Sequence, residues 1–285
     1  MKLRYILMSF VLAHSTQVFS CSMNGMEGFL PDNDMKIEVN DKVRNDMTEQ
    51  RFNEIINKVV KVYKPVIAKK FGILKVARKW NDPTVNASAQ RLGPVYLVNM
   101  YGGLARHQAV TDDAFALVVC HELGHHLGGA PKVSMILNKW ASNEGQADYF
   151  GTLKCFRKVF EADDNIAVVT SMSIDPVVTQ NCRQVFGNEE DVAMCQRAAM
   201  AGRSLAELLT FGRSRVDFST PDRAIVDRTD DAHPDAQCRL DTYFQASLCE
   251  RDANEAVSNK DPRKGTCARA DGYKVGIRPL CWYKP

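Results

Sequence analysis

A five-residue segment in the middle of the chain, residues 121–125, constrains the fold more than any other feature. It reads His-Glu-Leu-Gly-His and lies in a mostly apolar run that follows Thr111. Thr111 is a suitable N-cap, the two aspartates after it favour a helix start, and the Gly-Gly pair after Leu127 favours an end. We therefore predict one helix here, with His121 and His125 one turn apart on the same face, where both imidazoles can reach one metal ion.

Glu122, which follows His121 directly, completes a known metal-site pattern with the two histidines. Two histidines that flank a glutamate in this way form the HExxH pattern of zinc sites, in which the glutamate acts as general base. Zinc suits nitrogen and carboxylate ligands, and a catalytic zinc site has three protein ligands and a water. Glu122 would accept a proton from that water. Because such a trio buried in an apolar helix without a partner would cost free energy, a metal site is favoured over a chance match on a helix surface.

The next predicted helix, residues 142–160, offers the third ligand that such a site needs. Glu144 and Asp148 are one turn apart near its start. One of them can bind zinc while the other accepts a hydrogen bond from a ligand histidine. An acidic, solvated helix face is the alternative interpretation of the two carboxylates. The residues that would let the two helices approach closely are small: Gly124, Gly145, Ala147 and Gly151.

These motifs resemble those of gluzincin peptidases of the HtpX and CAAX prenyl protease type. Residues 144–148 match that family's Glu-x-x-Ala-Asp, and the lead-in through Gly102-Gly103 to an acidic helix cap is similar. The His-Pro pair at His233 with Arg239 beyond it resembles the family's His-Pro…Arg segment. The resemblance extends from about residue 50 to 250, with specific motifs only at these points.

The resemblance implies a zincin-like peptidase domain with one catalytic Zn²⁺ held by His121, His125 and Glu144, and with Asp148 supporting a ligand histidine through a hydrogen bond. It also implies that the strand expected over 95–100 is an edge strand that borders the cleft, where an extended peptide could add. No stretch after the N-terminal segment is apolar for long enough to span a bilayer, unlike the membrane-embedded members. Their prenylated or membrane-protein substrates are therefore not extended to this chain.

His233 has three interpretations. It could donate a hydrogen bond to the oxyanion of a tetrahedral intermediate, which would make it catalytic together with Glu122. It could instead be a fourth zinc ligand that closes the resting site. The third interpretation is a structural histidine at the start of a helix.

The N-terminus predicts export. Residues 1–20 combine a basic start, a short apolar run and a small residue at the end, which is the pattern of a secretory signal peptide. The residues before Cys21 also resemble a bacterial lipobox, although Phe19 is bulky for that motif. We expect a periplasmic protein, a membrane-anchored lipoprotein or a secreted one, and lipidation of Cys21 would be its only attachment to a membrane.

The cysteines favour an oxidising compartment, since eight of the nine remain when Cys21 is set aside and an even number in an exported protein suggests disulfides. Cys238 and Cys249 would be about 16 Å apart along a predicted helix over 234–248, which is too far for a disulfide. Two pairings are compatible with the predicted helices: Cys120 with Cys155, and Cys182 with Cys195.

Helical patterns dominate the rest of the chain, with three β-like runs over 73–80, 85–91 and 95–100, so we predict an α+β fold that is mainly α, with a small sheet. The expected organisation is a signal peptide, a flexible lead, a peptidase domain and a cysteine-stapled extension, over 1–20, 21–46, 47–250 and 251–285. Without Lys2 and Arg4 the 37 basic residues become 35 against 34 acidic ones, which gives no electrostatic reason to expect a nucleic-acid partner.

The function predicted from the sequence is that of a zinc-dependent metalloendopeptidase that hydrolyses peptide bonds in exported proteins, with Glu122 as general base. The alternative is a zinc-binding assembly or quality-control factor for envelope proteins, with a normally closed site and little or no general proteolysis. A purely structural zinc site is disfavoured, because such sites usually have four ligands rich in cysteine.

Overall fold

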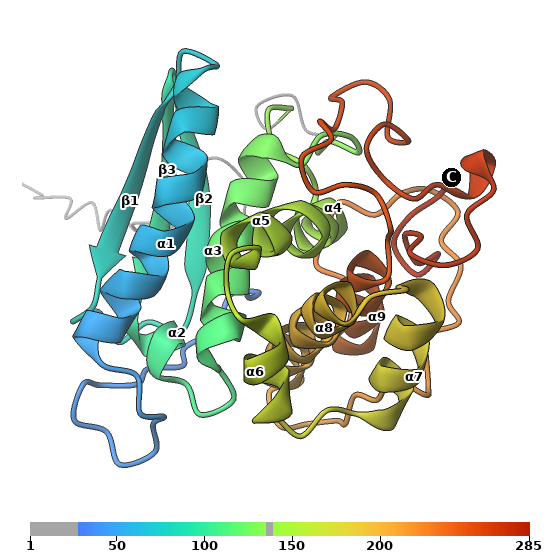
Figure 1. Ribbon diagram of the computed structural model, residues 1–285. Helices are drawn as coiled ribbons and strands as arrows, with labels where there is room; N and C mark the ends of the chain where they lie inside the picture. Colours follow the sequence, from blue (N-terminus) through green and yellow to red (C-terminus); the bar gives the residue numbers. More distant parts are fainter. Residues whose placement is uncertain (1–27, 135–138) are drawn as a thin grey trace, which may run out of the picture.

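The computed structural model describes residues 28–134 and 139–285. A small sheet with helix α1 (Glu49–Ala68) across it lies at one side of the molecule, and the remainder is helices joined by irregular connections (Figure 1). The predicted α+β class, mainly helical, is confirmed at this level. The predicted signal peptide and Cys21 lie outside the described residues. Among the residues that are described, no helix is both long and apolar enough to cross a membrane.

The sheet contains β1 (Ile73–Lys79), β2 (Ala87–Leu92) and β3 (Val95–Tyr101) in the order β1-β3-β2. β3 pairs parallel with β1 and antiparallel with β2. The prediction that residues 95–100 form the edge strand at the cleft is wrong. The two-residue turn after Leu92 places β2 and β3 side by side, with β2 on the side of β3 that is away from β1, so β3 is the central strand. β2 is the edge strand that packs against the helix containing the His-Glu-Leu-Gly-His segment.

That helix, α3 (Asp112–Leu127), lies at the centre of the molecule. Every residue from Ala114 to His126 is buried, because β2, α1, α8 and the segment after residue 143 all pack on it. Its N-cap is Thr111, whose side chain accepts a hydrogen bond from the backbone N–H of Ala114, and its C-cap is Gly128. A helix that is apolar all round must be buried in this way, and both predicted ends are confirmed.

The predicted helix over 142–160 consists of three consecutive helical pieces. α4 (Glu144–Phe150) continues into a π-helical turn (Gly151–Phe156) and then into α5 (Arg157–Phe160). A Cβ atom on Gly124 would lie 2.7 Å from the carbonyl oxygen of Ala147 and 2.9 Å from its Cα, and one on Gly151 would lie 3.2 Å from the backbone nitrogen of His121. These glycines therefore let α3 and α4 approach each other at the predicted place.

The remaining helices complete the body. α8 (Glu189–Leu209) and α9 (Ala236–Ser247) pack on each other, and both contact the α3–α4 region. Gly102-Gly103 begins the short helix α2 (Gly102–Arg106) directly after β3. The other elements are α6 (Asn165–Thr170), α7 (Pro176–Val185) and a 3₁₀ turn (Arg269–Asp271).

Four disulfides join these elements, and both predicted pairings are confirmed: Cys120–Cys155, Cys182–Cys195, Cys238–Cys281 and Cys249–Cys267. The last two fasten the irregular C-terminal residues to α9 and to the residues just after it. Trp282 is fully buried, donates a 2.9 Å hydrogen bond from Nε1 to Thr242 Oγ1, and packs against the Gly145 position at the start of α4. The C-terminal extension thus supports the helix that bears Glu144.

Residues 28–46 contain no helix or strand, but they pack closely on the body. Phe29 and Leu30 are fully buried, and the backbone N–H of Phe29 donates a 2.8 Å hydrogen bond to the carbonyl oxygen of Ala87 on β2. This packing differs from the flexible lead that the sequence predicts over 21–46.

Candidate metal site

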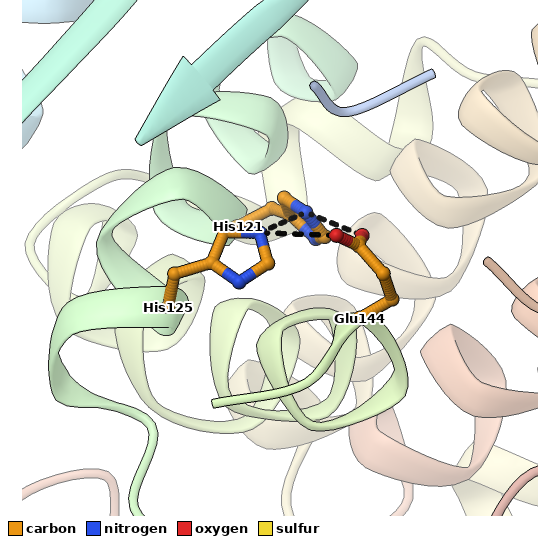
Figure 2. Close-up of side chains that lie close together, drawn as sticks. All are labelled: His121, His125 and Glu144. Atoms are coloured by element: carbon orange, nitrogen blue, oxygen red, sulfur yellow. Dashed lines mark hydrogen bonds and ion pairs between the residues drawn. The ribbon is translucent and has the colours of Figure 1, made fainter. Parts of the chain in front are cut away.

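Two helices bring three side chains to one point. His121 and His125 come from α3, and Glu144 is the first residue of α4 (Figure 2). The Nε2 atoms of the two histidines are 3.1 Å apart, Glu144 Oε2 is 3.2 Å from His121 Nε2, and Glu144 Oε1 is 3.5 Å from His125 Nε2. All three side chains are buried, and together they form a group that could hold a metal ion.

The other nitrogen of each ring has a fixed hydrogen bond. His121 Nδ1 lies 2.7 Å from Asp148 Oδ1, and His125 Nδ1 lies 2.9 Å from the carbonyl oxygen of Ser142. A carboxylate and a carbonyl oxygen only accept hydrogen bonds, so Nδ1 of each ring must donate, which leaves both Nε2 atoms directed at the shared point. This is the arrangement by which an outer hydrogen bond orients a metal-binding histidine.

Glu144 supports the same interpretation. Its Oε2 atom is buried and makes no hydrogen bond despite the neighbouring imidazole. Burial alone would raise the pKa of this carboxyl, but the neighbouring imidazoles of His233, His125 and His121 outweigh burial and lower the pKa well below its usual range. An ionised, buried carboxylate oxygen with no hydrogen bond beside two aligned nitrogens fits a nitrogen–oxygen metal site, and this donor set suits zinc.

Asp148 is the centre of a buried hydrogen-bond network behind His121. It accepts hydrogen bonds from His121, from the hydroxyl of Tyr243 at 2.7 Å, and from Arg239 at 2.7 Å (Nε) and 2.8 Å (Nη2). Burial raises the pKa of Asp148, but Arg239 and His121 outweigh it and lower the pKa below its usual value. The carboxylate therefore stays ionised and holds the His121 ring in place.

Tyr243 was not identified from the sequence. It lies one turn after Arg239 on α9, so the helical spacing from the predicted His-Pro…Arg segment is the signal that could have found it.

Glu122 lies on α3 beside His121 but is not one of the three clustered side chains. It is buried, and its Oε1 atom makes no hydrogen bond. Burial raises the pKa of Glu122 to about 8, with Glu144 and Asp148 acting in the same direction, against His121 and Arg239.

His233 lies at the edge of the cluster. Its Nε2 is 3.5 Å from Glu144 Oε2 and 2.8 Å from the carbonyl oxygen of Gly28. The structure thus brings His233 to the site but outside the His121–His125–Glu144 group, and its role stays a prediction.

A short N-terminal strap, residues 28–30, covers the cluster. The ring of Phe29 meets His121 edge-on with 5.0 Å between centroids, and its carbonyl oxygen accepts a 2.9 Å hydrogen bond from Arg239 Nη1. The backbone of Leu30 is held at both its N–H and its carbonyl by the side chain of Asn86. His121 is fully buried and Glu144 is 5% exposed, so the cluster is closed to solvent.

A further group with metal-binding residue types is Asp222 with Cys238 and Cys281. These two cysteines form a disulfide, so they offer no thiolate to a metal.

Comparison of the chain with protein-family models, with curated proteins and with solved structures finds no match. The resemblance to gluzincin peptidases therefore rests on the motif residues alone.

Proposed function

We propose that this protein is a zinc-dependent endopeptidase whose ion is held by His121, His125 and Glu144. One observation carries the proposal: two buried histidines, each with Nδ1 engaged, present Nε2 to the same point as an ionised carboxylate that lacks a hydrogen bond. A structural zinc site would need a fourth protein ligand, whereas Glu122 beside this one is a carboxylate to spare.

Zinc bound here would acidify a water and polarise the carbonyl of the peptide bond. Glu122 would accept the proton of the attacking water and pass it to the leaving amine. The charge of a zinc ion bound beside it would lower the raised pKa of Glu122 and keep the carboxylate ionised for this role, and its Oε1 atom makes no hydrogen bond. Asp148 and the carbonyl of Ser142 would hold the two imidazoles in place throughout. His233 would contact the substrate carbonyl from the edge of the site.

The strap indicates where a substrate would lie. Phe29 pairs through its backbone N–H with Ala87 on the edge strand β2, directly beside His121. An extended peptide can add to a sheet edge by the same kind of hydrogen bond. The strap therefore occupies the proposed substrate position, and it must leave before a peptide can reach the metal.

Replacing Glu122 by glutamine tests the proposal. The variant should bind one zinc ion per chain, as wild type does, and should lose cleavage, because an amide cannot accept the proton. Metal analysis and proteomic cleavage profiling of the two proteins measure this. A Glu122→Gln protein with wild-type cleavage would overturn the mechanism.

The closed site favours one other function. A zinc-binding assembly or quality-control factor for envelope proteins would keep its metal covered, as the strap does here. Such a protein would bind zinc, would not cleave casein, and would keep its cellular phenotype after Glu122→Gln. Either function fits an exported protein, in the periplasm, lipid-anchored or secreted, since four disulfides are typical of an oxidising compartment.

A further inference from the structure

A basic pocket lies at the C-terminal end of α3, beyond the metal cluster. It has a volume of about 280 Å³, and four of its lining side chains are cationic: Lys70, Arg91, Lys132 and Lys139. Tyr96, His126 and Trp140 form much of the remaining wall.

Among the residues that the structure describes, no carboxylate balances these charges. The lining residues include no aspartate or glutamate, and within residues 28–134 and 139–285 none of the four cations forms an ion pair. Burial, and after it the nearby charge of Arg91, lower the pKa of Lys132 to about 8. The carboxyl-terminal end of a helix such as α3 supplies only about half a negative charge, so the helix end does not account for four cations.

Arg91 and Lys132 have N–H groups that donate no hydrogen bond to the described residues. Arg91 Cζ lies 3.4 Å from the centroid of the Tyr96 ring, and the Nε and Nη2 atoms of Arg91 are 3.3 and 3.2 Å from His126 Nδ1. Lys132 donates to the carbonyl oxygen of Trp140 at 3.0 Å and to Ser142 Oγ at 3.4 Å. Since guanidinium carries five N–H donors and ammonium three, both groups keep donors for a ligand.

Ser142 links the basic pocket to the metal cluster. Ser142 contacts Lys132 through Oγ and accepts from His125 Nδ1 through its carbonyl oxygen. Arg91 lies on β2 four residues beyond Ala87, where the strap pairs. Alternate residues of a strand face the same side of the sheet, so Arg91 and Ala87 lie on the same face. Four residues of a strand span about 13 Å, which is the separation expected between them.

We propose that the basic pocket binds a carboxylate of the peptide substrate, so that the protein selects peptides with an acidic group about four residues from the one that pairs at Ala87. This rests on the proposed peptidase function. The shared chemistry is a carboxylate, which an aspartate or glutamate side chain or a free C-terminus can supply. Arg91 binds it through its guanidinium fork, and the lysines add charge.

Cleavage of a proteome-derived peptide library tests the selectivity. The wild-type profile should show an acidic residue, or a free C-terminus, at one fixed distance from the cut. Lys132→Gln and the double variant Lys70→Gln/Lys139→Gln should each weaken that preference about tenfold, as expected for a charge-assisted hydrogen bond, by raising KM without changing kcat. Lys75→Gln, which removes an exposed charge from β1, is the matched control and should leave the profile unchanged.

Short alanine-based peptides show whether the carboxylate comes from a side chain or from a free C-terminus. They also distinguish failure of the peptidase proposal from failure of the pocket proposal. Zinc-loaded Glu122→Gln protein should bind a fluorescein-labelled peptide with one Glu more tightly than its Gln counterpart, or a free C-terminus more tightly than an amide. Binding of this kind without cleavage by wild type would overturn the peptidase and keep the pocket. Cleavage with no acidic preference, or with a preference that the pocket variants retain, would overturn the pocket and keep the peptidase.

Discussion

Replacing Gly124 by alanine tests whether close contact between α3 and α4 builds the proposed metal site. The new Cβ would lie 2.7 Å from the carbonyl oxygen of Ala147, and ordinary contact begins at 3.4 Å, so α4 must move outward by about 0.7 Å. Glu144 lies at the start of α4 and would move with it. Metal–ligand distances tolerate only about 0.2 Å, so the three ligands could no longer meet in the same geometry.

Two free-energy terms oppose each other in this variant. Alanine is favoured over glycine inside a helix by about 1 kcal/mol. Overpacking of a close-packed interior costs about 1–3 kcal/mol. The contact is with backbone atoms, which cannot rotate away, so we expect the second term to prevail and the unfolding free energy to fall by up to about 2 kcal/mol.

The assay is competition for zinc against a chelator, together with thermal unfolding. We expect the zinc affinity of Gly124→Ala to fall about 10- to 100-fold, the range observed when the support of a ligand is disturbed. Gly187→Ala is the control, because no atom lies within 4 Å of its Cβ position. A Gly124→Ala protein with wild-type zinc affinity and equal or higher stability would refute the reasoning.

Three other predictions concern the surroundings of the site. Asp148→Asn leaves the buried Arg239 charge without its partner, so it should lower the unfolding free energy by about 3–5 kcal/mol and weaken zinc binding; an unchanged melting temperature would contradict this. Phe29→Ala removes the ring that covers His121, so a chelator should extract zinc faster than from wild type, and an equal rate would show that the strap does not control access. Asp163 forms ion pairs with two basic side chains that outweigh burial and lower its pKa below 3.8, so its stabilisation is complete above about pH 4 and is lost as the pH falls through the lowered value. The difference in melting temperature between wild type and Asp163→Asn should therefore shrink at acidic pH, and a constant difference would argue against the ion pairs.

The sequence predicted the features that depend on local signals. The ends of α3 follow from Thr111 and Gly128, and the one-turn spacing of Glu144 and Asp148 directs both toward the α3 histidines. The approach of the two helices was predicted from small residues, which the Gly124 contact confirms. In each of these cases the residues that interact are a few positions apart in the sequence or lie on consecutive long helices.

The features that were missed depend on contacts between distant parts of the chain. The strap meets Arg239 across 210 residues, and no periodic pattern marks Phe29 as a residue that covers a site. The central position of β3 depends on how β2 turns back, which the alternation of side chains does not specify. Tyr243 joins the network through a hydroxyl group, and the spacing along its helix indicates only that the residue is buried.

The disulfides have a consequence for metal loading. Soft thiolates compete well for zinc, and a reduced chain would offer eight of them outside residues 1–27. Cys238 and Cys281 lie with Asp222 in a group that could itself hold an ion if the bond between them were open. Oxidation therefore removes these competing ligands and leaves His121, His125 and Glu144 as the proposed zinc site. We expect the oxidised protein to load one zinc ion and the reduced protein to bind more, in the wrong places.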